Sequence, residues 1–122
     1  MTRQLLIVIA ALLALDTANA TRVLDQVENG FELTLSDLNL PSQGGQTISF
    51  SACPRCGIDT RRLMDTTVFK VNGHEVPLEE FLRIAAQIRE RPTDAARTFA
   101  GVFLDIASGR VTRIELREPA AN

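Results

Sequence analysis

The sequence has 122 residues, of which 45% are hydrophobic and 23% are charged, and its formal net charge is −2 at pH 7. This length favours a single small domain that can bury only a thin core. Nucleic-acid binding is not indicated, because the chain has no excess of basic residues and few aromatic rings for base stacking.

The N-terminal segment has the layout of a secretory signal peptide. Arg3 precedes an apolar run at residues 5–15, and Ala18-Asn19-Ala20 forms a small-x-small cleavage site. The apolar run is too short for a membrane-spanning helix, which needs about 20 apolar residues. We therefore expect a signal peptide at residues 1–20 and an exported protein, periplasmic or secreted, without membrane attachment after cleavage.

The chain beyond the signal peptide predicts one small β-rich domain at residues 21–116, followed by a flexible tail at residues 117–122. Apolar and polar residues alternate from Phe31 to Leu35, as in a strand with one buried face. Strands are expected at residues 31–35, 46–52, 60–63, 66–71, 74–76, 102–106 and 111–116, with a weaker signal through Val23 and Val27.

The clearest predicted helix spans residues 77–90. Its apolar residues recur at helical spacing and form one face. They are Leu78, Phe81, Leu82, Ala85 and Ile88. Pro77 suits the first helical position, and Pro92 ends the helix. Residues 93–97 are compatible with one further helical turn or with a loop.

Short turns join several of the expected strands. Asn72-Gly73 is typical of a type I′ hairpin turn, and Gly109 suits a second tight hairpin. Strands joined in this way pair antiparallel, and so small a sheet needs closure or cover to be stable. The sequence therefore predicts an α+β fold: a small antiparallel β-barrel or strongly curled sheet of about five to six strands with one main amphipathic helix.

The two cysteines, Cys53 and Cys56, lie in the segment Cys-Pro-Arg-Cys. In an exported domain they are expected to pair with each other. A structural disulfide would lock the turn after the preceding strand. Alternatively, the pair could perform thiol–disulfide exchange, with Arg55, Arg61 and Arg62 as candidate cations that stabilise a thiolate or bind a ligand.

Two local resemblances to known proteins bear on the role of the cysteine pair and on the fold. The Cys-Pro-x-Cys pattern at residues 53–56 resembles the active-site motif of thioredoxin-like and glutaredoxin-like proteins, which implies redox catalysis by Cys53 and Cys56. The residues after Cys56 lack helical apolar spacing, so the resemblance does not extend to that fold. The segment Thr67–Phe81 is similar to small exported β-barrel modules of unassigned function, which implies a barrel-like module and no catalytic residues.

No metal or cofactor is expected. Zinc sites use four ligands, and the single histidine, His74, lies at a turn where a solvated surface position is the simpler reading. We therefore expect an exported small binding or structural module with a Cys53–Cys56 disulfide, whose partner is a protein or a small ligand. The alternative is a thiol–disulfide redox or redox-sensing protein that uses the same pair.

Overall fold

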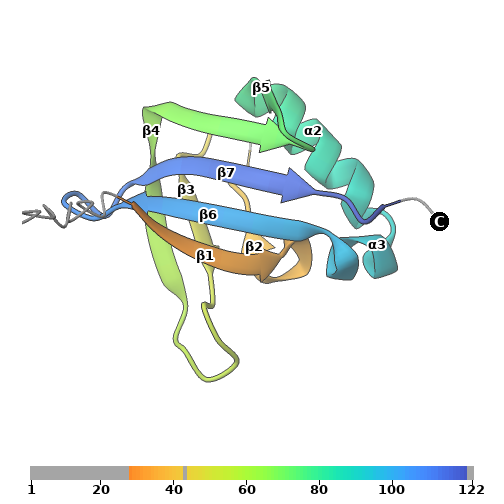
Figure 1. Ribbon diagram of the computed structural model, residues 1–122, viewed down its shortest axis with the longest axis horizontal. Helices are drawn as coiled ribbons and strands as arrows, with labels where there is room; N and C mark the ends of the chain where they lie inside the picture. The colour runs from red at the N-terminus through yellow and green to blue at the C-terminus, as the bar shows by residue number, and fades with distance from the viewer. Residues whose placement is uncertain (1–27, 43, 121–122) are drawn as a thin grey trace, which may run out of the picture.

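The computed structural model describes residues 28–42 and 44–120, which form an α+β fold built on an open, strongly curled mixed sheet, a half-barrel (Figure 1). This confirms the predicted fold class. The elements are β1 (Glu28–Thr34), η1 (Leu35–Asp37), β2 (Leu38–Asn39), β3 (Thr47–Phe50), β4 (Asp59–Val71), β5 (His74–Val76), α2 (Leu78–Arg89), α3 (Pro92–Arg97), β6 (Phe99–Asp105) and β7 (Val111–Arg117). The expected signal peptide and the weak strand signal through Val23 and Val27 lie outside the described residues.

The strand order is β1-β6-β7-β4-β3-β2, and β5 pairs with β4. All neighbouring strands are antiparallel except β4 and β7, which run parallel with Phe69 opposite Ile114. The curled sheet is therefore mixed, whereas the short turns in the sequence indicated antiparallel pairing. The cause is the connection through α2, α3 and β6, which brings the chain back to β4 in the same direction instead of through a tight turn.

β4 is a single strand that turns a corner in the sheet, where the sequence predicted two separate strands (Figure 1). Its register with β7 shifts between Leu63 and Val68. At this shift the Met64 N–H donates to Thr67 Oγ1 at 2.7 Å, and the Thr67 hydroxyl donates to the Val111 carbonyl at 2.7 Å. The Thr67 side chain thus replaces ladder hydrogen bonds that the bulge interrupts.

One hydrophobic core lies between the inner face of the half-barrel and the helices (Figure 1). Aromatic rings pack in two pairs within it: the Phe31 and Phe50 centroids are 5.2 Å apart, and the Phe69 and Phe81 centroids are 5.1 Å apart. The largest fully buried side chains include Phe50, Phe81, Leu35, Leu38 and Ile48. The rings therefore join β1 to β3 and β4 to α2.

The helix predicted at residues 77–90 is confirmed as α2. The sequence predicted that Pro77 occupies the first helical position. In the structure Pro77 is instead the N-cap of α2, with an extended ψ of 157°. Phe81, Ala85 and Ile88 are buried, whereas other members of the predicted apolar face are only partly covered. Pro92 begins a second helix, α3, so the segment after α2 is helical rather than a loop.

The Arg89 side chain links the end of α2 to η1 and β2 through hydrogen bonds. Its Nη2 donates to the Leu35 carbonyl at 3.3 Å and also to the Leu38 carbonyl. Partial burial lowers the pKa of Arg89, because desolvation penalises its charge. None of the helices described is long and apolar enough to cross a membrane.

The β4–β5 hairpin has the predicted turn. Asn72 and Gly73 both take positive φ values, 50° and 85°, as a type I′ turn requires. The Asn72 side chain also accepts a hydrogen bond from the Glu118 N–H at 3.0 Å. The chain beyond β7 is therefore anchored at its first residue, and Arg117 belongs to β7 rather than to the predicted tail.

The β6–β7 hairpin also forms as predicted, with Gly109 at a φ of 68°. Hydrogen bonds from the Ser108 side chain and N–H lower the pKa of Asp105. The predicted strand extended to Ile106, but β6 ends at Asp105 and Ile106 is 47% exposed. The turn takes this residue out of the ladder, so its side chain does not join the core.

Candidate functional site

A long loop between β3 and β4 extends away from the half-barrel (Figure 1). We call its residues 51–58 the cysteine loop. Cys53 and Cys56 form a disulfide within it, with their Cα atoms 5.0 Å apart. The Cys56 N–H donates to the Cys53 carbonyl at 3.0 Å, and the Ser51 hydroxyl lies 2.7 Å from the same oxygen. The disulfide and these hydrogen bonds hold the loop in a tight turn.

The cysteine loop is open to solvent. Both cysteines are exposed, and the Ile58 side chain is 78% exposed. A hollow of about 540 Å³ beside Cys53 is also lined by Glu32 and Asp37. Carboxylates disfavour a nearby thiolate, whereas cations would stabilise one. Solvent can therefore reach the disulfide, but the neighbouring hollow does not have the positive charge of a reactive thiol site.

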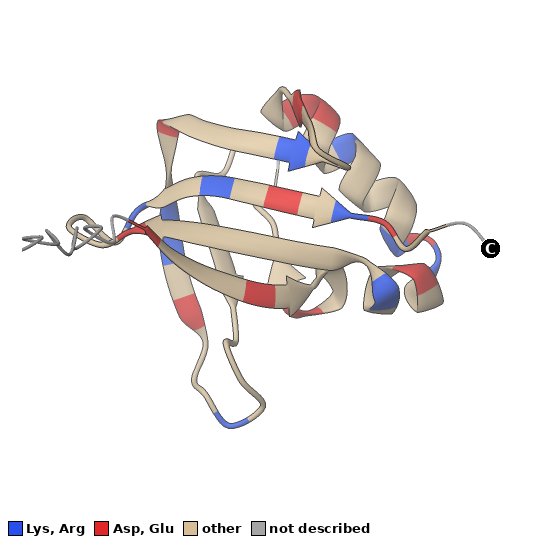
Figure 2. Cartoon of the chain, in the orientation of Figure 1, with Lys and Arg blue, Asp and Glu red and all other residues tan. Residues whose placement is uncertain are grey.

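The three candidate arginines have different surroundings. Arg55 lies in the cysteine loop, and Figure 2 shows a basic position at the loop's tip. Arg61 is held on β4: its Nε lies 2.8 Å from Asp59 Oδ1, and its Nη1 donates to the Gly109 carbonyl at 3.3 Å. Arg62 is exposed on β4, opposite a residue of β3. Only Arg55 is thus part of the turn that holds the disulfide.

A trough lies between the β2–β3 loop and α2, and it begins at the corner of β4. It consists of three hollows of about 700, 700 and 410 Å³. The first and second share Gly45, Gln46 and Leu78 as lining residues, and the second and third share Pro41 and Leu82. The hollows therefore lie next to one another from the corner of β4 to the end of α2, and we call the trough that they form the α2 groove.

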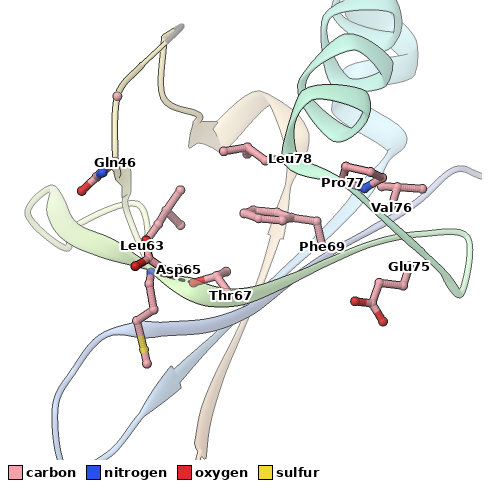
Figure 3. Close-up of a pocket in the computed structure, with 11 residues that line it drawn as sticks. Gln46, Leu63, Asp65, Thr67, Phe69, Glu75, Val76, Pro77 and Leu78 are labelled. Carbon is pink, nitrogen blue, oxygen red and sulfur yellow. Dashed lines mark hydrogen bonds between the residues drawn. The ribbon is translucent and has the colours of Figure 1, made fainter.

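Apolar side chains form part of the lining of the α2 groove, beside polar ones such as Gln46, Asp65 and Thr67. Seven hydrophobic side chains lie partly buried against the core, and all except Phe31 and Ile84 line this groove. The five that line it are Leu40, Leu63, Val76, Leu78 and Leu82. Figure 3 shows Leu63, Phe69 and Leu78 directed toward a common space. Apolar surface gathered in one concave place is typical of a binding site.

Acidic positions gather at one end of the α2 groove, where β5 leads into α2 (Figure 2). Glu75 and Glu79 line this part of the groove, whereas Asp65 lies at the corner of β4 on the other side of the first hollow (Figure 3); none of the three has an ion-pair partner among the residues that the structure describes. Figure 3 shows the Glu75 side chain directed away from the apolar floor, so it lies at the rim. Lys70 lies directly opposite Glu75 in the β4–β5 ladder, although no ion pair joins the two side chains. Along the whole groove the lining carboxylates outnumber the lining bases: they are Asp65, Glu75, Glu79 and Glu90 against Arg83 and Arg89.

The structure gives no metal centre within residues 28–42 and 44–120, where no three histidine, cysteine or acidic side chains are grouped to hold an ion. His74 is exposed beside the β4–β5 turn, as the sequence suggested.

Sequence reasoning found the cysteine pair but missed the α2 groove. It assigned Leu78 and Leu82 to the buried face of α2 together with Phe81, because all three lie on the same apolar arc. The apolar arc gives no separate signal for the groove, since Ile84, which widens this arc, does not line the groove.

No protein-family model matches this chain, no curated protein is similar to it in sequence, and no solved structure matches its fold. Function is therefore inferred from the geometry of the α2 groove and the cysteine loop.

Proposed function

We propose that this protein is a small exported binding module whose ligand occupies the α2 groove. The observation that carries the proposal is the concentration of partly exposed apolar side chains along this single trough, which includes Leu63, Leu78 and Leu82. A purely structural role does not need an apolar floor open to water. A ligand that covers this floor gains the free energy of removing apolar surface from water, about 25 cal/mol per Å².

The neutral apolar dye Nile red tests this proposal. We expect saturable dye binding to the wild-type protein and its loss in Leu82→Glu, because a carboxylate on the floor of the groove opposes an apolar ligand. Ile84→Glu is the matched control, since Ile84 is also partly buried on α2 but does not line the groove. Circular dichroism checks that both variants fold. Equal dye binding by wild type and folded Leu82→Glu would contradict the proposal.

Export is part of the proposal, and it is supported by the signal-like N-terminus and the cysteine pairing. The full chain, expressed in a bacterial host, is expected to yield an extracytoplasmic protein that starts at Thr21. Its intact mass should be lower by two hydrogens than that of the reduced form, because Cys53 and Cys56 are oxidised. Recovery of the full-length, reduced chain from the cytoplasm alone would refute export.

Thiol–disulfide exchange is the second candidate function. It is favoured by the exposure of Cys53 and Cys56, which lets a partner thiol reach the disulfide. The acidic hollow beside Cys53 and the engagement of Arg61 by Asp59 oppose this candidate. We therefore assign the disulfide a structural role within the cysteine loop.

Insulin reduction in the presence of dithiothreitol separates the two roles. We expect the wild-type protein to show no turnover above an albumin control. The paired replacement of Cys53 and Cys56 by serine is expected to lower the free energy of unfolding by only about 1–2 kcal/mol, because the ring that they close is short. Clear turnover that Cys53→Ser alone abolishes would instead establish the redox function.

A further inference from the structure

We propose that the ligand of the α2 groove is an extended segment of another protein that presents apolar side chains and a lysine or arginine. The basic side chain would lie near Glu75 and Glu79, where β5 leads into α2. This inference rests on the proposed binding function and adds the chemical class of the ligand.

The length of the groove favours an extended chain. The second and third hollows follow α2, whose 12 residues span about 18 Å at 1.5 Å per residue. An extended segment rises about 3.3 Å per residue, so five to six residues cover this length. Three neighbouring hollows, which share Leu78 and Leu82 in turn as lining residues, offer successive places for the side chains of such a segment. One compact small molecule would fill only part of the trough.

The backbone at the start of α2 can bind a peptide carbonyl. Pro77 is the N-cap and makes no side-chain capping hydrogen bond. In the described part of the chain, the N–H groups of Leu78, Glu79 and Glu80 have no hydrogen-bond acceptor in the protein, as first-turn amides commonly do not. These donors would normally favour an anion, but the carboxylates around them oppose one. A neutral acceptor such as a backbone carbonyl can accept hydrogen bonds from these amides without being repelled by the carboxylates.

The charge of the groove selects a basic side chain. Glu75 and Glu79 line the groove where β5 leads into α2, and Asp65 lines it at the corner of β4; none of the three has an ion-pair partner among the described residues. Arg83, which lines the middle of the groove, lies 3.8 Å from Glu80 rather than from any of these three. Because four carboxylates and two arginines line the groove, a lysine or arginine from the ligand would be favoured and an acidic ligand would be repelled.

Capped, fluorescent hexapeptides in which leucine and serine alternate provide the probe. One pair carries arginine at the first or the last position, and a matched pair carries glutamate there. Fluorescence anisotropy at low salt should show at least about tenfold tighter binding of one arginine peptide than of its glutamate counterpart. Replacing Asp65 by asparagine together with Glu79 by glutamine should reduce this preference to under about threefold. Glu80→Gln, which does not line the groove, should preserve it.

The possible failures are distinguishable. Leu82→Glu should abolish binding of all the peptides, and about 0.5 M salt should weaken the arginine preference. Equal binding of arginine and glutamate peptides would overturn the charge selection while the groove itself remains a binding site. Nile red binding without any peptide binding would overturn the extended-segment proposal. Dimerisation in sedimentation that Leu82→Glu abolishes would identify a second copy of this chain as the occupant and would also overturn it. A lack of both dye and peptide binding would reject the proposed function.

Discussion

Replacing Phe81 by alanine is expected to lower the free energy of unfolding by about 3 kcal/mol or more. The Phe81 side chain is fully buried, and its ring packs 5.1 Å from that of Phe69. Its removal loses the transfer free energy of the ring and leaves a cavity between α2 and β4 that the surrounding backbone cannot close completely. Urea denaturation followed by circular dichroism measures the change.

Glu80→Ala is the control for this prediction, since Glu80 is the exposed neighbour of Phe81 in the same helix. Its carboxylate lies 3.8 Å from Arg83, and such a surface ion pair contributes little. The change should therefore cost under about 0.5 kcal/mol. Equal, small losses for the two variants would show that α2 does not present Phe81 to the core.

Replacing Thr67 by valine is expected to cost about 2–4 kcal/mol. The two side chains have similar shapes, but valine cannot accept the hydrogen bond from the Met64 N–H or donate one to the Val111 carbonyl. Each backbone group left without a partner costs about 1–3 kcal/mol where water cannot replace it. Because these bonds hold the corner of β4, hydrogen exchange of the Met64 and Val68 amides should also accelerate.

Thr66→Val is the matched control at the adjacent position, where the side chain is exposed and makes no such hydrogen bonds. We expect a change within about 0.5 kcal/mol for this variant. If Thr66→Val and Thr67→Val are equally stable, the corner of β4 does not depend on the Thr67 hydroxyl.

Local sequence signals predicted the elements whose conformation local chemistry decides. The apolar spacing around Phe81 and Ile88 predicted α2, and Asn72-Gly73 predicted the type I′ turn. These signals succeed because helical periodicity and positive φ depend on residues close together in the chain.

Features that depend on distant contacts were not predictable in this way. The parallel pairing of β4 with β7 results from the long connection through α2 and α3, which no local pattern encodes. The continuity of β4 depends on the bond from Thr67 to Val111, a residue 44 positions away. Pro77 is compatible with both the N-cap and the first helical position, so its type alone did not decide between them.

The candidate sites also combine features that local sequence predicts with features that depend on distant contacts. The pairing of Cys53 with Cys56 was predicted from their spacing and the expected export. The hydrogen bond from Arg61 to the Gly109 carbonyl was not predictable, because it forms only when the fold brings the β6–β7 turn to β4. The α2 groove arises between the β2–β3 loop and α2, where Leu78 and Leu82 are left partly uncovered. Sequence periodicity shows that these leucines share a face, but not that the fold leaves it partly uncovered.

The most direct test of the binding function is to locate a bound apolar probe on the protein. Indole, a soluble apolar molecule, can be titrated into ¹⁵N-labelled protein while amide chemical shifts are recorded. We predict that the largest shift changes fall on the α2 groove, at Gly45, Leu78 and Leu82, and saturate together. Changes centred on Cys53 and Cys56, or spread over the surface without saturation, would contradict the assignment of the α2 groove as the binding site.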